Sequence, residues 1–346
     1  MRLARIACTA GLAGLFAAAL GAPAAHAQGN LVLYCANVDD WCRVMVPAFE
    51  RKTGIKVAMT RKSSGEVFAQ IKAEASNPKA DLWWGGTGDP HVQAAEEGLT
   101  LEYKSPNLSQ LHDWGVRQWE QTKGRTVGIF AGAMGFGFNT KLLADKKIPE
   151  PACWADLLDP RFKDEVQVAD PNSAGTAYNA LATIVQLMGE DQGFDYMKKL
   201  HRNVNQYTKS GAAPAKAVSL GETAVGINFQ HDLVPFVRDG APMKIVSPCE
   251  GTGYEIGSMS IIKGARNLKE AQAWYDWALS TEAQETGPLA GVSYQVPANK
   301  AARTAKEAPD FSKIKFINYD FAKYGSSEVR RHLLAKWTAE VKNQPK

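Results

Sequence analysis

The sequence predicts an α/β protein made of two lobes. Short apolar stretches alternate along the chain with stretches of helical periodicity, a pattern typical of an open and largely parallel sheet flanked by helices. The 346 residues exceed what one hydrophobic core usually supports, which favours two lobes. With 45% hydrophobic and 22% charged residues, the composition is that of an ordinary globular protein.

The first 27 residues have the three regions of a secretory signal peptide. Two arginines near the start are followed by an apolar run over 6–20, and Ala25 and Ala27 occupy positions −3 and −1 of an A-x-A cleavage site. The apolar run is shorter than the ~20 residues that a membrane-spanning helix needs, which argues against a permanent anchor. We therefore predict cleavage after Ala27 and a periplasmic chain.

The first part of the exported chain alternates strands with helices. Strands are expected at 31–34, 55–59 and 80–84, and helices at 41–53 and 67–75. In open α/β sheets, ligands bind in the crevice outside the carboxyl ends of the strands. The loops after these three strands are therefore candidate binding loops.

The chain is expected to cross twice between the lobes. Residues 127–139 form glycine-spaced extended segments that suit a first crossing, and 254–262 suit the return. Strands at 166–169 and 221–229 would belong to the second lobe, and the remainder of the chain is mainly helical. Two crossings with a cleft between the lobes would make a clamp that closes on a ligand.

Four cysteines remain after cleavage: Cys35, Cys42, Cys153 and Cys249. An even number in an exported chain indicates disulfides. Cys35–Cys42 is the local pairing and Cys153–Cys249 the long one, but the sequence leaves all three connectivities open. A zinc site is disfavoured because there is no C-x-x-C pair and no neighbouring histidine cluster.

Several functional classes are disfavoured by composition and motifs. The net charge of +4 is small and no basic stripe is present, so we expect no nucleic-acid partner. The sequence contains no nucleophile elbow, no H-E-x-x-H motif and no metal-ligand cluster, so we expect no enzyme activity, no cofactor and no bound metal.

Five segments resemble, in order and spacing, the periplasmic solute-binding proteins of ABC importers, in particular the type II group that contains ferric-iron-binding proteins. They are LVLYC at 31–35, FERKTGIKV at 49–57, ADLWWGG at 80–86, FNTK at 138–141 and SAGTA at 173–177. The resemblance implies two lobes, each a mixed sheet flanked by helices, joined by hinge strands. It assigns 28–130 with 257–346 to the first lobe and 131–256 to the second. It also implies a monomer that delivers its ligand to an inner-membrane permease.

The ligand class follows from a departure from the ferric-binding pattern. Ferric-binding members carry two adjacent tyrosines at the place where this chain reads FQHD over 229–232. Because phenolate oxygens suit a ferric ion, their absence argues against iron. Residues 208–214 and 250–256 are similar to the branch that binds hexose phosphates, so the resemblance implies a sugar phosphate such as glucose 6-phosphate.

Two expected helix starts, one in each lobe, carry hydroxyl groups or glycine. They hold Ser63 and Ser64 in one lobe, and Ser173, Gly175 and Thr176 in the other. Helix N-termini favour anions, so one phosphate dianion could hold both lobes together. Thr87 belongs to a third possible donor loop. Ordinary helix capping would explain the same residues without a ligand.

The hydroxyl groups of a sugar need carboxylates and switchable donors. His231, Asp232 and Glu255 offer these, and the resemblance places all three at the cleft. Since a carboxylate repels a phosphate, this cluster suits the neutral ring better than the anionic end. The alternative is a purely structural role for His231 with Asp232, or for Glu255 near the hinge.

Other functions remain open from the sequence. The ligand could instead be a phosphonate, a phosphoglycerate-like acid or iron held with an exogenous anion. A periplasmic phosphatase or hydrolase is the alternative from another class. A sensor that presents its ligand to a membrane receptor would use the same clamp, so the sequence does not separate it from a transport component.

Overall fold

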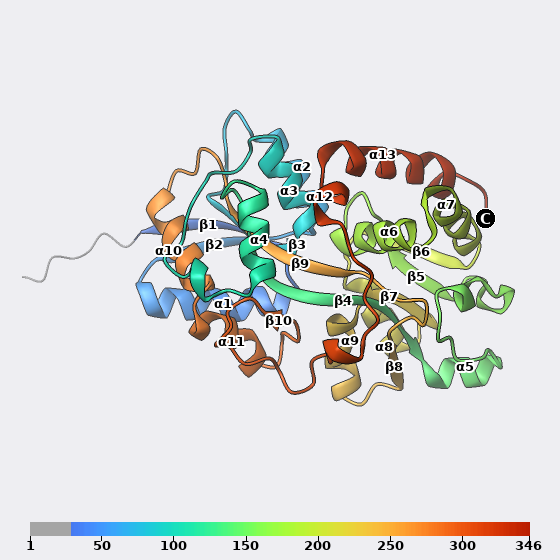
Figure 1. Ribbon diagram of the computed structural model, residues 1–346. Coiled ribbons are helices and arrows are strands. Elements are labelled where there is room, and N and C mark those ends of the chain that lie inside the picture. The colour runs from blue at the N-terminus through green and yellow to red at the C-terminus, as the bar shows by residue number, and fades with distance from the viewer. Residues whose placement is uncertain (1–28) are drawn as a thin grey trace, which may run out of the picture.

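The computed structural model describes residues 29–346, so the predicted signal peptide lies outside the described residues. The described part forms ten strands and thirteen α-helices. Figure 1 shows two α/β lobes connected by two long strands, β4 (Val127–Asn139) and β9 (Tyr254–Ile261). The predicted two-lobed α/β class is confirmed. No helix within 29–346 is both long enough and apolar enough to cross a membrane.

The first lobe contains a mixed sheet covered by helices. Its own strands are β1 (Asn30–Cys35), β2 (Lys56–Arg61), β3 (Leu82–Thr87) and β10 (Val296–Pro297). Its helices are α1 (Asp39–Thr53), α2 (Ser64–Ala73), α3 (Gly88–Glu96), α4 (Asp113–Gln121), α10 (Leu268–Ala278) and α11 (Thr281–Leu289). β1 pairs in parallel with β2 and β3, as the alternating pattern predicts, whereas β9 runs antiparallel to β3.

The second lobe repeats this plan. Its own strands are β5 (Val166–Ala169), β6 (Val204–Thr208), β7 (Val225–Phe229) and β8 (Met243–Val246). Its helices are α5 (Thr140–Lys146), α6 (Gly175–Met188), α7 (Glu190–His201), α8 (Ala213–Leu220) and α9 (Gln230–Arg238). β5 pairs in parallel with β6 and β7, and the crossing strand β4 is antiparallel to β7 and β8.

The predicted first crossing is one continuous strand. β4 pairs with β9 as far as Ala133, and from Met134 onward it pairs with β7. All of its residues are buried. The lobes are therefore joined through a shared strand whose two halves belong to different cores.

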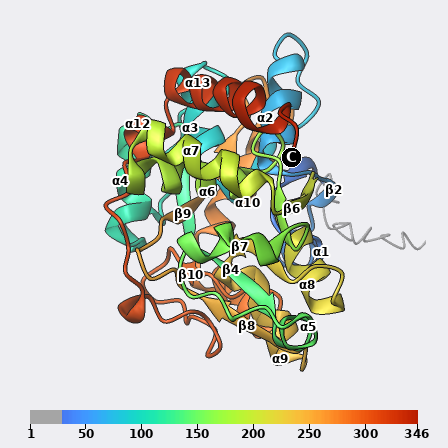
Figure 2. The same ribbon diagram turned by 90° about the vertical axis from the view of Figure 1, so that its right-hand side faces the viewer.

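The C-terminal segment contains α12 (Phe321–Tyr324) and α13 (Ser327–Trp337). Leu333 and Trp337 are buried in the same core as Phe136 of the second half of β4. Figure 2 shows α13 lying above α6 and α7. The lobe boundaries predicted from the sequence assign this segment to the first lobe; we propose instead that residues 316–346 are counted with the second.

The structure selects one of the three possible disulfide connectivities. Cys35 is bonded to Cys42, and Cys153 is bonded to Cys249. The first bond joins the end of β1 to α1. The second joins two loops of the second lobe that lie 96 residues apart in the chain.

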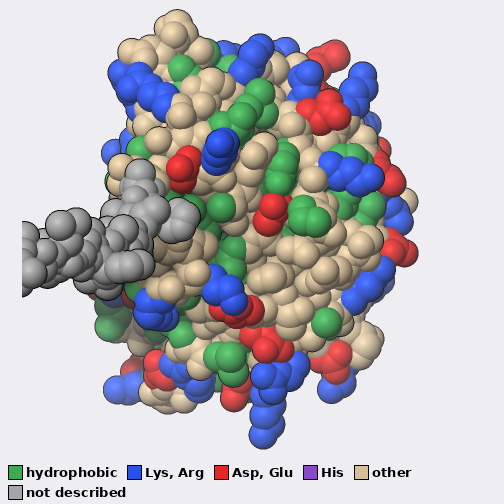
Figure 3. Space-filling view, turned by 90° about the vertical axis from the view of Figure 1, so that its left-hand side faces the viewer, with side chains coloured by type: hydrophobic (Ala, Val, Ile, Leu, Met, Phe, Trp, Pro, Cys, Tyr) green, Lys and Arg blue, Asp and Glu red, His purple; other side chains and the backbone are tan. Residues whose placement is uncertain are grey.

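The outer face of the first lobe carries charges of both signs. Figure 3 shows Lys and Arg interspersed with Asp and Glu over this face, without a continuous basic surface. The distribution on this face fits the small net charge of the chain.

Candidate functional site

A cavity of about 450 Å³, partly open to solvent, lies between the lobes. Its walls come from the loops after β1 and β3, the starts of α2, α6 and α9, and the hinge strands β4 and β9. Eight of the nine predicted site residues line it: Ser63, Ser64, Thr87, Gly175, Thr176, His231, Asp232 and Glu255.

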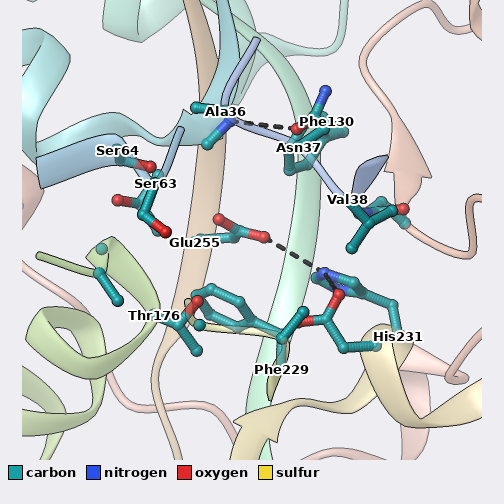
Figure 4. Close-up of a pocket in the computed structure, with 18 of the residues that line it drawn as sticks. Ala36, Asn37, Val38, Ser63, Ser64, Phe130, Thr176, Phe229, His231 and Glu255 are labelled. Carbon is teal, nitrogen blue, oxygen red and sulfur yellow. Dashed lines mark hydrogen bonds and ion pairs between the residues drawn. The ribbon is translucent and has the colours of Figure 1, made fainter. Parts of the chain in front are cut away.

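Figure 4 shows how these side chains are distributed. Ser63, Ser64 and Thr176 lie on one side of the cavity, His231 lies on the other, and Glu255 points between them. The two groups of residues that the sequence singles out therefore lie in one cavity, at different ends. The strand-end rule explains this convergence, because the end of β3, the start of α9 directly after β7 and the start of α6 all meet at the cleft.

Ser173 is the predicted residue that does not line the cavity. Its carbonyl oxygen accepts a hydrogen bond from the Gly65 backbone N–H at 3.0 Å, and its Oγ donates to the Lys209 carbonyl oxygen at 3.0 Å. Gly65 opens the first-lobe helix α2, whereas Ser173 belongs to the second lobe. The structure therefore places Ser173 at the contact between the lobes, beside the cavity.

Ser63 also takes part in this contact. Its backbone N–H donates to Glu66 Oε2 at 3.1 Å, as a capped helix start requires, and its Oγ donates to the Lys209 carbonyl oxygen at 3.2 Å. Both the capping interpretation and a position at the cavity therefore hold for this residue.

The two lobes are closed on each other at the cavity rim. A Cβ atom added to Gly175 would lie 1.9 Å from Thr87 Oγ1, and one added to Gly65 would lie 2.8 Å from the Ser173 carbonyl oxygen. Atoms this close would clash, so both positions need glycine in this closed arrangement.

His231, Asp232 and Glu255 form a buried cluster. His231 Nε2 lies 3.6 Å from Asp232 Oδ1 and 3.5 Å from Glu255 Oε1. These distances are longer than good hydrogen bonds. Among the described residues, His231 Nδ1 has no hydrogen-bond partner at all. The cluster therefore has hydrogen-bonding capacity that its own members do not use.

Burial decides the protonation of this cluster. It raises the pKa of Asp232 to about 7, although the Arg61 guanidinium and a hydrogen bond with Asn228 act in the opposite direction. Burial, assisted by the charge of Asp232, raises the pKa of Glu255 well above its usual range. Burial lowers the pKa of His231 to about 3. At neutral pH the imidazole is therefore neutral, and burial favours the protonated form of Glu255, so the cluster offers both donors and acceptors.

Arg61 is a charged residue of the cavity wall outside the set predicted from the sequence. Its side chain lines the cavity, and its Nε donates to the Asn37 carbonyl oxygen at 2.9 Å. Burial lowers its pKa, and the nearby carboxylate of Asp232 partly offsets this. Arg61 is the last residue of β2, so the strand-end rule applied to every strand would have identified it.

Ten further residues complete the wall, and the sequence singles out none of them as a binding residue. They are Ala36, Asn37, Val38, Gly86, Phe130, Ala174, Gly211, Ala212, Phe229 and Gln295. Gly86 and Ala174 directly neighbour predicted residues along the chain. Gln295 does not, because it reaches the cavity from the distant segment after α11.

The described residues offer no evident metal centre at this cavity. The only three side chains in 29–346 grouped closely enough to hold an ion are Cys153, Cys249 and Glu250, and the two cysteines form a disulfide. The cavity wall, as described, contains no tyrosine.

Known proteins with similar sequences and structures include periplasmic binding proteins. An uncharacterized protein of Haemophilus influenzae is 48% identical over 99% of both chains. The Fe(3+)-binding periplasmic protein of Serratia marcescens is 26% identical over 82% of this chain and 84% of its own. The periplasmic binding protein AfuA from Actinobacillus pleuropneumoniae, solved with exogenous fructose-6-phosphate bound, is 47% identical with a TM-score of 0.89, covering 92% of this chain and 100% of AfuA.

A family described as bacterial extracellular solute-binding protein matches residues 77–324, which is most of the chain. The chain therefore belongs to the bacterial extracellular solute-binding proteins and, within them, to the ferric-binding-protein-like group.

Proposed function

We propose that this protein is the periplasmic substrate-binding component of an ABC importer, and that it captures a hexose phosphate by closure of its lobes. The observation that carries the proposal is a single interlobe cavity with two different ends. One end has helix starts from both lobes, and the other has the His231, Asp232 and Glu255 cluster. A sugar phosphate has the same two-ended chemistry.

The phosphate is expected at the starts of α2 and α6. The residue before α6 is Ala174, whose side chain cannot cap the helix, so the first N–H groups of α6 remain available to an anion. Gly175 and Thr176 follow at the cavity wall, and Ser63 and Ser64 face them from the other lobe. Arg61 adds a positive charge to the same cavity. Binding one dianion between these groups would stabilise the closed lobes.

The sugar is expected at the opposite end. A neutral imidazole and two carboxyl groups can each pair with a hydroxyl group, which both donates and accepts. The bound fructose-6-phosphate in AfuA, at 47% identity over nearly the whole chain, supports this ligand class. Glucose 6-phosphate and fructose 6-phosphate are the first ligands to test.

Iron and catalysis are less well supported. A ferric ion favours phenolate ligands, and the described cavity wall contains none. A phosphatase needs an activated nucleophile, but the Ser63 hydroxyl donates its hydrogen bond to the Lys209 carbonyl oxygen and not to a base. We therefore propose binding without chemistry, followed by delivery to an inner-membrane permease.

The test is a thermal-shift panel on the chain without residues 1–27. Glucose 6-phosphate and fructose 6-phosphate are expected to raise the Tm by mass action, whereas free glucose and ferric citrate are not. H231A and D232A should each abolish the shift without lowering the unliganded Tm. H332A, at an exposed histidine of α13, is the matched control. A shift with ferric citrate and none with any sugar phosphate would refute the proposal.

A further inference from the structure

Gln295 is a polar residue of the cavity wall that no sequence motif indicates. It lies in the segment between α11 and β10, and it is only 6% exposed. It also lines a smaller and mainly apolar cavity that includes Trp41 and Trp84. It therefore separates the interlobe cavity from the interior of the first lobe.

The orientation of the Gln295 amide is fixed by its neighbours. Its Oε1 accepts hydrogen bonds from the Ser293 hydroxyl at 2.7 Å and from the Tyr294 backbone N–H at 3.0 Å. Because a backbone N–H only donates, the atom that faces it must be the amide oxygen. The NH₂ group is therefore turned away from this loop, and no described residue accepts a hydrogen bond from it.

A second buried glutamine of the same lobe shows the contrast. Gln284 donates through Nε2 to the Ile129 carbonyl oxygen at 3.0 Å, and its Oε1 accepts from the Asn299 backbone N–H at 2.9 Å. Both ends of that amide are used by the protein, as a structural role requires. Only one end of the Gln295 amide is used in this way.

Strand register places Gln295 at the sugar end of the cavity. β10 pairs with β4 so that Val296 lies opposite Ala131. Continuing this antiparallel register by one residue beyond the strand would put Gln295 opposite Gly132. On its other side, Gly132 lies opposite Glu255. A Cβ atom added to Gly132 would lie 2.3 Å from the His231 ring and 3.2 Å from Glu255 Oε1. Gln295 and Glu255 therefore flank Gly132 from the two neighbouring segments, which brings Gln295 next to the cluster of His231, Asp232 and Glu255.

We propose that Gln295 is a specificity-determining residue whose amide NH₂ donates a hydrogen bond to an oxygen atom of the sugar. This inference rests on the proposed function and assigns it a further contact. The NH₂ group can only donate, whereas the neighbouring carboxyl groups can accept a hydroxyl proton. A hydroxyl placed between them would satisfy both partners, and a ligand without that oxygen would leave the NH₂ unpaired inside the closed cavity. Sites built in this way reject such analogues strongly.

The test compares glucose 6-phosphate with its 1-, 2-, 3- and 4-deoxy analogues by isothermal titration calorimetry on the chain without residues 1–27. For the unmodified protein, we expect at least one analogue to bind roughly ten-fold or more weakly than the parent. Q295M keeps the size of the side chain. We expect it to bind glucose 6-phosphate more weakly, and to bind that one analogue no more weakly than glucose 6-phosphate. The penalties for the other analogues should remain.

Two further variants separate a ligand contact from a structural role. Q295E keeps an oxygen that can accept from Ser293 and Tyr294 but replaces the NH₂ by a second oxygen. It should therefore lower the affinity for glucose 6-phosphate at least as much as Q295M does. Q121M changes an exposed glutamine and should alter nothing. The Tm of each variant is measured to establish that it is folded.

The outcomes are distinct. If Q295M weakens the parent and every analogue by the same factor, or weakens none of them, Gln295 has a structural role only and the inference is overturned. If the unmodified chain binds no sugar phosphate, the proposed function fails and this inference fails with it. The inference is supported if Q295M loses its discrimination against one deoxy analogue and keeps its discrimination against the others.

Discussion

The buried carboxyl group of Asp232 makes the stability of the unliganded protein depend on pH. Its pKa is about 7 in the folded chain against an ordinary value of 3.8, so between about pH 4 and pH 7 the folded state binds more protons than the unfolded state. The free energy of unfolding contributed by this group therefore falls as the pH rises through that window. His231, whose pKa is lowered to about 3, acts in the opposite direction between pH 3 and 6.5.

D232N removes the titration of Asp232 and leaves that of His231. We expect the Tm of D232N, relative to the unmodified protein, to be higher at pH 8 than at pH 5, measured without ligand. Differential scanning calorimetry at the two pH values checks this. An equal Tm difference at both would show that Asp232 is not the titrating group.

Gly175 is expected to control closure without affecting the fold of its own lobe. It opens α6 and its φ is not positive, so alanine suits the backbone there, but the added Cβ would meet Thr87 Oγ1 across the cleft. G175A should weaken glucose 6-phosphate binding at least ten-fold in calorimetry, because a contact this short cannot persist in the closed form. The unliganded Tm should not fall.

A compensating variant makes this interpretation specific. T87A removes the oxygen that G175A would meet, so the double variant should bind more tightly than G175A alone. If G175A binds as well as the unmodified protein, the closed contact between these residues is not needed for binding.

Eight of the nineteen residues that line the cavity could be predicted from the sequence. The strand-end rule predicts the loop that holds Thr87, and the resemblance predicts His231 at the cleft; the structure places both in the wall. Ser173 lies beside the cavity, at the contact between the lobes. Its place could not be predicted, because the packing of one lobe on the other decides which hydroxyl groups face the cavity. Gln295 could not be predicted, since its position depends on the pairing of β10 with a strand more than 160 residues earlier.

At the scale of elements, the disulfides stabilise the two lobes unequally. The Cys153–Cys249 bond spans 96 residues of the second lobe, whereas Cys35–Cys42 spans only 7. Closing a longer loop removes more conformational entropy from the unfolded chain. We expect C153S/C249S to lower the free energy of unfolding by about 2–5 kcal/mol, and more than C35S/C42S does. Urea unfolding of the oxidised proteins measures the difference; an equal or smaller loss for the long loop would contradict it.

Elements were predicted well where the hydrophobic pattern is local. The helix expected at 41–53 corresponds to α1, and the strand expected at 166–169 is β5. The extended segments over 127–139 were expected as a pair and form one strand, because tertiary pairing on both edges keeps their glycines extended. The two-residue strand β10 has no local pattern and exists only through its partner.

At the scale of the whole molecule, α13 links the two lobes. Arg330 is buried, and its Nε donates to Gln93 Oε1 of α3 at 3.0 Å. Its guanidinium lies 4.3 Å from the centre of the Tyr178 ring in the second lobe. Asp89, also buried, has a pKa raised by burial to about 6, with Arg330 acting in the opposite direction.

R330M keeps most of the packing but removes the positive charge that faces Asp89. The carboxyl group can be neutralised by a proton at low pH but not at high pH, so the loss in Tm should be larger at pH 8 than at pH 5. Small-angle scattering with saturating glucose 6-phosphate should also give a larger radius of gyration than for the unmodified protein. R331A, at an exposed arginine beside it, is the control. Equal losses at both pH values would exclude Asp89 as the partner.

The two cores are interleaved along the chain, which has a consequence for the order of synthesis. The first core takes side chains from Leu31 to Ala298, and the second from Met134 to Val341. Proteins made of consecutive domains can fold one domain at a time as the ribosome proceeds. Here neither core can be completed until nearly the whole chain has been translated. We therefore expect the nascent chain to remain largely unfolded during synthesis. An unfolded chain suits passage across the inner membrane, which the predicted signal peptide at 1–27 would direct.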